Sequence, residues 1–398
     1  MQNLWLLLLR LIALRLVQNA CDVVLIFNFT KISYFLLNNS NQIQEKRIIG
    51  LMSGTSLDGL DIACVLFSHN TEQVDFVLEA AETVPLPTPL KERLLRIEEQ
   101  SPRAIFKLNA ELGRFYAEAV NSFLASNNLK KESIDAIASH GQTIFHQPED
   151  GFTVQLGCGS TLAYHTGIPV INDFRSLDVA AGGQGAPLVP IGDQLLFGGM
   201  AEAFINIGGF ANISFTNRGT TVAFDVCPGN LPMNTYARQL GKEYDAGGEI
   251  AASHVADPTL LQVLNQLAYY QQDGPKSLGT EWLESNFYPC ISSHISPSVV
   301  ISTINEHIAH QLVSVLEKHN LKRAYITGGG AFNTTLTNHI KANYTGELII
   351  PSAEIINFKE AIIFSFLGYR FLNQEFNSLA SVTGAHENVC GGALHYPR

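Results

Sequence analysis

A short polar stretch between two apolar runs is the first candidate for chemistry in this sequence. Residues 53–59 (SGTSLDG) separate the apolar runs 47–51 and 62–67, which indicates a hairpin. Gly54 and Gly59 allow positive φ and a close approach of backbone to ligand. Backbone N–H groups and hydroxyls at such a turn cradle phosphate oxygens, and Asp58 would face a phosphate-bound Mg²⁺ through water. The alternative is an ordinary hairpin turn that binds nothing, and the Gly-Lys-Ser/Thr pattern of a P-loop is absent.

A second polar cluster follows a short apolar strand predicted over residues 134–139. His140, Gly141, Gln142 and Thr143 come directly after it. Ligand-binding groups of α/β sheets commonly lie where strands end, so His140 and Gln142 are candidate binding residues. The alternative is structural, since a single histidine more often packs than reacts.

Three further segments are rich in glycine or end on a carboxylate. Residues 182–187 (GGQGAP) predict a backbone contact with a ligand or a hinge, with a plain linker as the alternative. Residues 203–214 repeat the strand, Gly-Gly turn and strand of the first hairpin around Gly208 and Gly209. A strand over 222–225 ends on Asp225, and a strand over 324–327 ends at Gly328.

Two similar halves are therefore expected to position these residues. Each half begins with a strand, glycine turn and strand, over 48–67 and 203–216, and continues with alternating strands and helices. Duplicated α/β domains facing across a cleft would place phosphate-contacting turns on opposite walls and exclude water on closure. Further strands are predicted over 75–83, 153–156 and 169–175. Helices are predicted over 90–99, 103–127, 157–166, 233–240, 301–318 and 360–372. Ser101-Pro102 would cap the helix over 103–127, and another helix would start at Asn333.

Composition bounds the class of protein. A chain of 398 residues predicts two or three domains. The formal net charge of −11, without a Lys/Arg cluster, argues against nucleic-acid binding. Six cysteines without a CxxC pair fit free thiols in a reducing compartment, so we expect a cytoplasmic protein without a disulfide framework or zinc site.

The first 46 residues differ from the rest. Residues 4–16 are Leu-rich but interrupted by Arg10 and Arg15, and further apolar patches cover 23–27 and 32–37. A signal peptide or membrane anchor is one interpretation, but the stretch lacks an uncharged apolar run of about 20 residues and an Ala-x-Ala-like site. We favour a translated extension outside the fold, which then begins near Arg47, and expect no stable membrane association.

Six motifs in register carry a specific resemblance. They are GLMSGTSLDGLD (50–61), SHGQT (139–143), DFR (173–175), GGQGAPLVP (182–190), NIGGFANIS (206–214) and GGGAFN (328–333). In this order they resemble the anhydro-N-acetylmuramic acid kinase family of bacterial cell-wall recycling, from residue 47 to the C-terminus. The resemblance implies an α/β fold of two RNase H-like, actin-like ATPase domains facing across an ATP cleft. Domain I would cover 47–175 plus about 385–398, and domain II 176–384.

The resemblance also implies a reaction and a set of site residues. The family opens the 1,6-anhydro ring of its sugar with water and transfers the ATP γ-phosphate to O6, giving N-acetylmuramic acid 6-phosphate and ADP, with ATP and Mg²⁺ required. Its general base falls on Asp225, and a second carboxylate near the sugar on Glu360. The implied sugar-side residues are His140, Gln142, Asp173 and Arg175. The implied nucleotide-binding residues are Gly54, Thr55, Ser56, Leu57, Asp58, Gly59, Leu60, Asp61, Gly208, Gly209, Gly328, Gly329 and Gly330, and no protein metal ligand is assigned.

The chemistry needs a base of this kind, because water is a poor nucleophile and a carboxylate must accept its proton as it attacks C1. Two residues beside Asp225 depart from the family pattern. Val226 replaces the usual Thr or Cys, and Cys227 replaces a Gly. A positive φ at Cys227 would cost about 1 kcal/mol and displace the carboxylate.

Two other functions stay open at this point. One is a kinase of the same fold that acts on an ordinary hexose, and the other is a catalytically silent nucleotide-binding switch. The HGQT and GGQGAP motifs argue against the first, and the presence of Asp225, Glu360 and the sugar-side motifs argues against the second. The family resemblance also suggests a homodimer.

Overall fold

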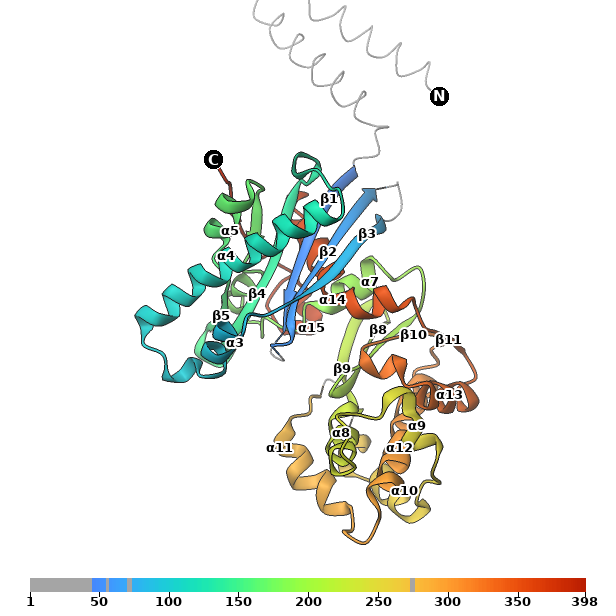
Figure 1. Ribbon diagram of the computed structural model, residues 1–398. Coiled ribbons are helices and arrows are strands. Elements are labelled where there is room, and N and C mark those ends of the chain that lie inside the picture. The colour runs from blue at the N-terminus through green and yellow to red at the C-terminus, as the bar shows by residue number, and fades with distance from the viewer. Residues whose placement is uncertain (1–44, 55–56, 70–73, 273–275) are drawn as a thin grey trace, which may run out of the picture. The chain divides into compact units, whose positions relative to one another are not determined.

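Figure 1 shows the computed structural model, which describes residues 45–54, 57–69, 74–272 and 276–398. The predicted extension of residues 1–46 lies outside the described residues up to residue 44. Strand β1 begins at Glu45, two residues before the predicted start of the fold. Thr55 and Ser56 also lie outside the described residues. Within the part of the chain that is described, no helix combines the length and apolar character needed to cross a bilayer.

The first sheet is built around a buried apolar strand. Its order is β12-β6-β4-β1-β2-β3, with β5 paired to β4. β1, β2 and β3 pair antiparallel, whereas β4 and β6 run parallel to β1. Ile48, Ile49 and Leu51 of β1 are fully buried, as expected for a central strand covered on both faces. The strands are β1 (Glu45–Ser53), β2 (Gly59–His69), β3 (Val74–Pro85), β4 (Ala136–Gln147), β5 (Phe152–Leu156), β6 (Val170–Asn172) and β12 (Ala393–His395).

The second sheet repeats this topology. Its order is β11-β10-β7-β8-β9, with β7, β8 and β9 antiparallel and β10 and β11 parallel to β7. With β5 and β12 left out, the strands of the first sheet follow the same 3-2-1-4-5 order as those of the second, the order of RNase H-like domains, which confirms the predicted α/β fold. The strands are β7 (Ala203–Ile207), β8 (Phe210–Asn217), β9 (Thr220–Pro228), β10 (Arg323–Thr327) and β11 (Glu347–Ile349).

Helix starts follow local capping chemistry. The Ser101 hydroxyl accepts the Ala104 N–H at the start of α4, and Asn333 caps α13 in the same way, both as predicted. The helices are α3 (Thr88–Leu95), α4 (Pro102–Ser126), α5 (Gly159–Thr166), α6 (Ser176–Ala180), α7 (Val189–Leu195), α8 (Asn230–Gln239), α9 (Glu249–Ala252), α10 (Pro258–Asn265), α11 (Thr280–Trp282), α12 (Pro297–Lys318), α13 (Thr334–Asn343), α14 (Ala353–Leu372) and α15 (Ala380–Thr383).

Three predicted placements of site residues are wrong. β4 continues to Gln147 because its second half pairs with β5, so His140 and Gln142 lie inside a strand instead of after one. β9 continues past Asp225 to Pro228, so Asp225 does not end its strand, and β9 forms the edge of its sheet. α14 begins at Ala353, capped by Ser352, so Glu360 lies within the helix and not at its start.

Helix α14 connects the site to the first sheet. It packs against β1, β2 and β4, although it lies in the range predicted for domain II. The approach to β1 is close, because a Cβ on Gly50 would overlap the Ala361 carbonyl oxygen and lie 2.8 Å from the Ser365 nitrogen. The predicted domain boundaries at 175 and 385 stay a prediction.

Gly50→Ala is expected to destabilise the fold. The added methyl group has no space against the α14 backbone, and overpacking of this kind costs about 1–3 kcal/mol or more. The free energy of unfolding in urea measures the effect. Gly208→Ala is the matched control, because its Cβ would lie 3.5 Å from its nearest neighbour. Equal stability of the two variants would contradict the predicted close contact.

Candidate active site

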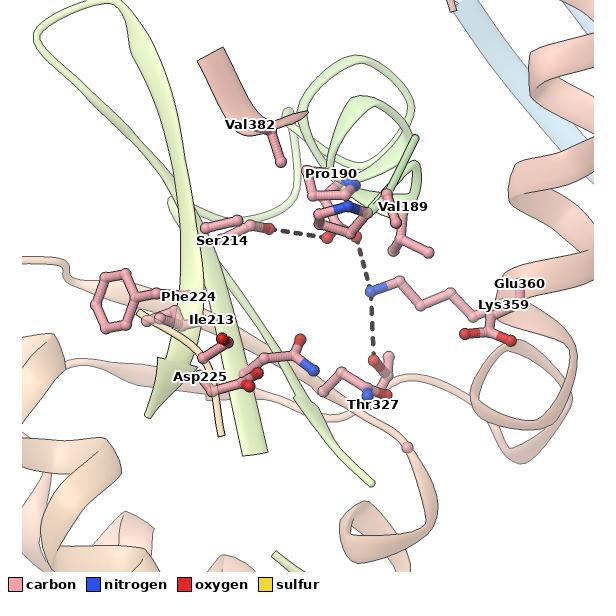
Figure 2. A pocket seen from close by; sticks show the side chains of 18 of the residues that line it. Val189, Pro190, Ile213, Ser214, Phe224, Asp225, Thr327, Lys359, Glu360 and Val382 are labelled. Carbon is pink, nitrogen blue, oxygen red and sulfur yellow. Dashed lines mark hydrogen bonds and ion pairs between the residues drawn. The ribbon is translucent and has the colours of Figure 1, made fainter. Parts of the chain in front are cut away.

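One cavity of about 770 Å³ collects candidate residues from both sheets and from α14. Asp61 on β2 and His146 on β4 belong to the first sheet, and Asp225 on β9 belongs to the second. Figure 2 shows Asp225, Thr327 and the Lys359-Glu360 pair around this space. The lining also includes Gln184, Ala186 and Pro187 of the glycine-rich segment, Val189 and Pro190 of α7, and Asn206, Asn212, Lys276 and Gly328.

A β-bulge sets the direction of Asp225. Asp225 lies opposite Asn212 on β8, whereas Cys227 lies opposite Ala211, so Val226 is the extra residue on β9. A bulge of this kind bends a strand and redirects its side chains. Cys227 is buried in β9 and has no positive φ, so the strain considered from the sequence is absent.

The Asp225 carboxylate is half-buried at the cavity wall. Burial raises its pKa, and a 2.8 Å hydrogen bond from the Leu278 N–H to Oδ2 opposes the rise. A carboxylate that borders a ligand-sized cavity and has a raised pKa suits the role of a general base.

Glu360 and Asp61 add two more carboxylates to the cavity. The Glu360 side chain is exposed to the cavity, but desolvation by the surrounding protein raises its pKa. The charges of Arg175 and Lys359 oppose that rise, and nearby Asp61 adds to it. Burial also raises the pKa of Asp61, against the hydrogen bond of 2.6 Å that Asp61 accepts from Thr83. Two carboxylates of the cavity wall are thus available to orient water or to face a cation.

Partly buried Arg175 and buried His140 form a hydrogen-bonded pair. Arg175 donates to His140 Nε2 at 2.8 and 3.1 Å, and to the Gly185 carbonyl at 2.7 Å. Burial, then the Arg175 charge, lowers the pKa of His140 to about 3. His140 is therefore neutral near pH 7, with the ring proton on Nδ1, and its role here is to hold Arg175 and through it the glycine-rich segment.

The other predicted sugar-side residues have structural contacts. Gln142 is buried, accepts the Ser53 hydroxyl at 2.6 Å and donates to the Gly54 carbonyl at 3.2 Å, so it braces the first hairpin. Asp173 is exposed and accepts the Ser176 hydroxyl. None of His140, Gln142, Asp173 and Arg175 lines the cavity, and their contact with a sugar stays a prediction.

The predicted nucleotide-binding residues divide between the two hairpins and the turn after β10. In the first hairpin the positive φ falls on Leu57 (56°), whereas Gly59 is required because a Cβ there would lie 2.8 Å from the Val84 carbonyl oxygen. Asp61 lines the cavity, and Leu60 is buried in the core. Gly54 and Asp58 do not line it.

The second hairpin and the turn after β10 lie close together. The carbonyls of Gly208 and Gly209 accept N–H groups of Asn230 and Gly229, where β9 leads into α8. Gly328 lines the cavity with φ of 81°, and a Cβ there would lie 2.6 Å from Asn206 Oδ1. Gly329 and Gly330 continue into a short 3₁₀ turn and do not line the cavity.

A buried ion pair in the cavity wall is not marked by any motif of the sequence. Lys359 Nζ lies 2.7 Å from Asp193 Oδ1 and 3.3 Å from Thr327 Oγ1, and Ser214 donates to Asp193 Oδ2 at 2.8 Å. Figure 2 shows these contacts as dashed lines. They join α14, α7, β10 and β8, and both charged side chains are only 6% exposed. No spacing rule in the sequence pairs residues 166 positions apart.

Asp178 is a second buried carboxylate that the sequence did not reveal. It accepts hydrogen bonds from the Gly185 N–H at 2.7 Å and from the Ser378 and Thr383 hydroxyls at 2.5 and 2.8 Å. These bonds attach the glycine-rich segment to the chain around α15. Among the described residues, no group of three or more His, Cys, Asp or Glu side chains is arranged to hold a metal ion by itself.

Removing one partner of the Lys359–Asp193 pair is expected to be costly. Lys359→Met leaves a buried, unpaired carboxylate and should lower the free energy of unfolding by about 3 kcal/mol. Lys359→Met with Asp193→Leu should cost clearly less than the two single changes added together. Arg323→Met is the control, because its ion pair with Glu347 is exposed and contributes about 1 kcal/mol or less. Additive costs in the double variant would show that the two charges are not coupled.

His140 should make stability depend on pH. Between pH 3 and 6.5 the unfolded histidine is protonated and the folded one is neutral, so folding releases a proton and stability rises with pH. We expect His140→Gln to reduce this slope by up to about 1.4 kcal/mol per pH unit. Urea unfolding at several pH values measures it, with His294→Gln, at an exposed site, as the control. An unchanged slope in His140→Gln would contradict neutral burial of His140.

Comparisons with known proteins agree with the sequence motifs. The profile of the anhydro-N-acetylmuramic acid kinase family matches residues 46–397. The anhydro-N-acetylmuramic acid kinase of Francisella tularensis subsp. novicida is 36% identical over 378 residues, which cover 89% of this chain and 99% of the relative. The enzyme of the same name from Pseudomonas fluorescens is 37% identical, with 87% and 98% covered.

A solved structure gives a much weaker match. The activator of the 2-hydroxyisocaproyl-CoA dehydratase from Clostridium difficile, with bound ADPNP, is 12% identical, with 82% and 97% covered and a TM-score of 0.40. The family profile and the relatives cover almost the whole described chain, and they show that this protein belongs to the anhydro-N-acetylmuramic acid kinase family.

Proposed function

We propose that this protein opens the 1,6-anhydro ring of 1,6-anhydro-N-acetylmuramic acid with water and phosphorylates O6 with ATP. The products are N-acetylmuramic acid 6-phosphate and ADP, as expected for recycling of cell-wall sugars. The family match over residues 46–397 supports the reaction. The observation that carries the proposal is the cavity in which Asp225 and Glu360 border one ligand-sized space.

Asp225 is the proposed general base for ring opening. A water oxygen attacks C1, the bond from C1 to the bridging oxygen breaks, and the water proton passes to the Asp225 carboxylate. The freed bridging oxygen becomes O6 of the open sugar. Burial supports this role, because it raises the pKa of Asp225 toward the range in which a carboxylate exchanges protons effectively.

Phosphoryl transfer is proposed to follow ring opening. O6 forms a bond to the γ-phosphorus while the bond from that phosphorus to the β–γ bridging oxygen breaks and ADP leaves. Proposed nucleotide contacts come from residues 54–61, from Gly208 and Gly209, and from residues 328–330. Gly328 at the cavity wall is the described member of this set whose backbone conformation most requires glycine.

Glu360 and Asp61 are proposed to act beside the reacting groups. Glu360 would orient the attacking water, since it borders the cavity and its charge is balanced by Arg175 and Lys359. The two carboxylates fit a Mg²⁺ ion whose remaining ligands are water and nucleotide phosphate, the usual mode for this ion. When bound, Mg²⁺ neutralises charge on the transferred phosphoryl group.

Several expectations from the sequence remain proposals. We propose that Arg175, with His140 behind it, places the glycine-rich segment against the sugar, and that Gln142 and Asp173 support the surrounding turns. We also propose a cytoplasmic location, a homodimer, and the absence of nucleic-acid and stable membrane partners. The proposed domains are 47–175 plus about 385–398, and 176–384.

Asp225→Asn should abolish turnover while leaving ATP binding intact. Loss of a positioned general base slows a reaction by about 10²–10⁴-fold. The assay is ADP release by residues 45–398 with ATP, Mg²⁺ and 1,6-anhydro-N-acetylmuramic acid, with mass detection of a sugar product heavier by one phosphate and one water.

Asp150→Asn, at an exposed carboxylate away from the cavity, is the control and should keep normal turnover. Near-normal turnover of Asp225→Asn would remove Asp225 from the base role. ATP binding without any sugar-dependent ADP in the unaltered protein would remove the proposed reaction.

A further inference from the structure

We propose that residues 276–278, named here the base strap, together with Tyr269, position the Asp225 carboxylate and set the pH range in which it works. The inference rests on the proposed function, in which Asp225 is the general base. It assigns a catalytic task to backbone groups and to a tyrosine that no motif of the sequence marks.

The base strap pairs with the free edge of β9 at Asp225. β9 is the last strand of its sheet, so the outward backbone groups of Asp225 have no partner strand. The Asp225 N–H donates to the Lys276 carbonyl at 3.0 Å. Two residues further on, the Leu278 N–H donates to Asp225 Oδ2 at 2.8 Å. The same short segment therefore holds both the backbone and the carboxylate of Asp225.

Tyr269 fixes the other side of the same residue. Its hydroxyl donates to the Asp225 carbonyl at 2.6 Å, and its ring is buried against Trp282 at a centroid distance of 5.4 Å. Lys276 joins Tyr269 to the base strap, because its Nζ donates to the Tyr269 carbonyl at 2.9 Å and lies 4.3 Å from the ring centroid. Asp225 is thus held at N–H, C=O and Oδ2 by one connected unit.

The bond from Leu278 has a chemical consequence as well as a geometric one. An N–H donor stabilises the ionised carboxylate, whereas burial destabilises it. The base strap therefore keeps Asp225 deprotonated at a pH where burial alone would leave it protonated. Because Leu278 occupies Oδ2, the proton from water would pass to Oδ1.

Leu278→Pro removes this N–H and provides the test, with Leu278→Ala as the matched control that loses the side chain but keeps the donor. The readout is the acid-side midpoint of the profile of kcat/KM against pH, measured with ATP, Mg²⁺ and the anhydro sugar. We expect the midpoint of Leu278→Pro to rise by about one pH unit or more, and that of Leu278→Ala to match the unaltered protein. A rate loss that is uniform across pH in Leu278→Pro would overturn the proposal.

Tyr269→Phe is the second variant, and it tests the positioning of Asp225 independently of Leu278→Pro. We expect kcat to fall about tenfold at unchanged KM for ATP, without a shift of the midpoint, because the hydroxyl contacts the carbonyl and not the carboxylate. Thermal unfolding shows whether each variant is folded. An unchanged kcat in folded Tyr269→Phe would overturn the positioning role.

Failure of this inference can be told apart from failure of the proposed function. If Asp225→Asn keeps its turnover, the base assignment itself is wrong and the base strap has no base to serve. If Asp225→Asn is inactive while Leu278→Pro keeps the midpoint of the unaltered protein, only the role of the base strap is wrong.

Discussion

Helix α14 lies so close to β1 that its backbone occupies the space a side chain at Gly50 would need. That contact fixes the helix against the first sheet. The same helix carries Glu360 into the cavity, and its Lys359 forms the buried pair with Asp193 of α7. The position of Glu360 in the site, and the contacts of Lys359 with Asp193 and Thr327, therefore depend on Gly50.

Protein groups hold the two cations of the site in place. Arg175 donates hydrogen bonds to neutral His140 and to the Gly185 carbonyl, and Lys359 forms an ion pair with Asp193, so each cation has a fixed position from which it acts on Glu360. Such preorganised groups need not rearrange as charge develops in a reaction. The same arrangement buries ionisable groups, so the fold loses stability when one member of a pair is removed.

Local signals predicted much of this fold and only part of the site. Capping at Ser101 and Asn333, the two strand–turn–strand units and the long helices follow from short-range chemistry that the sequence displays. The extension of β4 through His140 depends on pairing with β5, and the edge position of β9 depends on the order of strands in space. Likewise, the Lys359–Asp193 and Leu278–Asp225 contacts join residues that are far apart in the sequence. The second contact uses a backbone N–H, which every residue except proline carries.

The edge position of β9 has a consequence for how molecules of this protein behave together. Edge strands offer unpaired backbone groups to strands of other chains, and such pairing leads to aggregation. At Asp225 the N–H and the C=O are both taken by Lys276 and Tyr269 of the same chain. The segment that orients a carboxylate therefore also protects this edge of the sheet, so selection for activity and selection for solubility act on the same few hydrogen bonds.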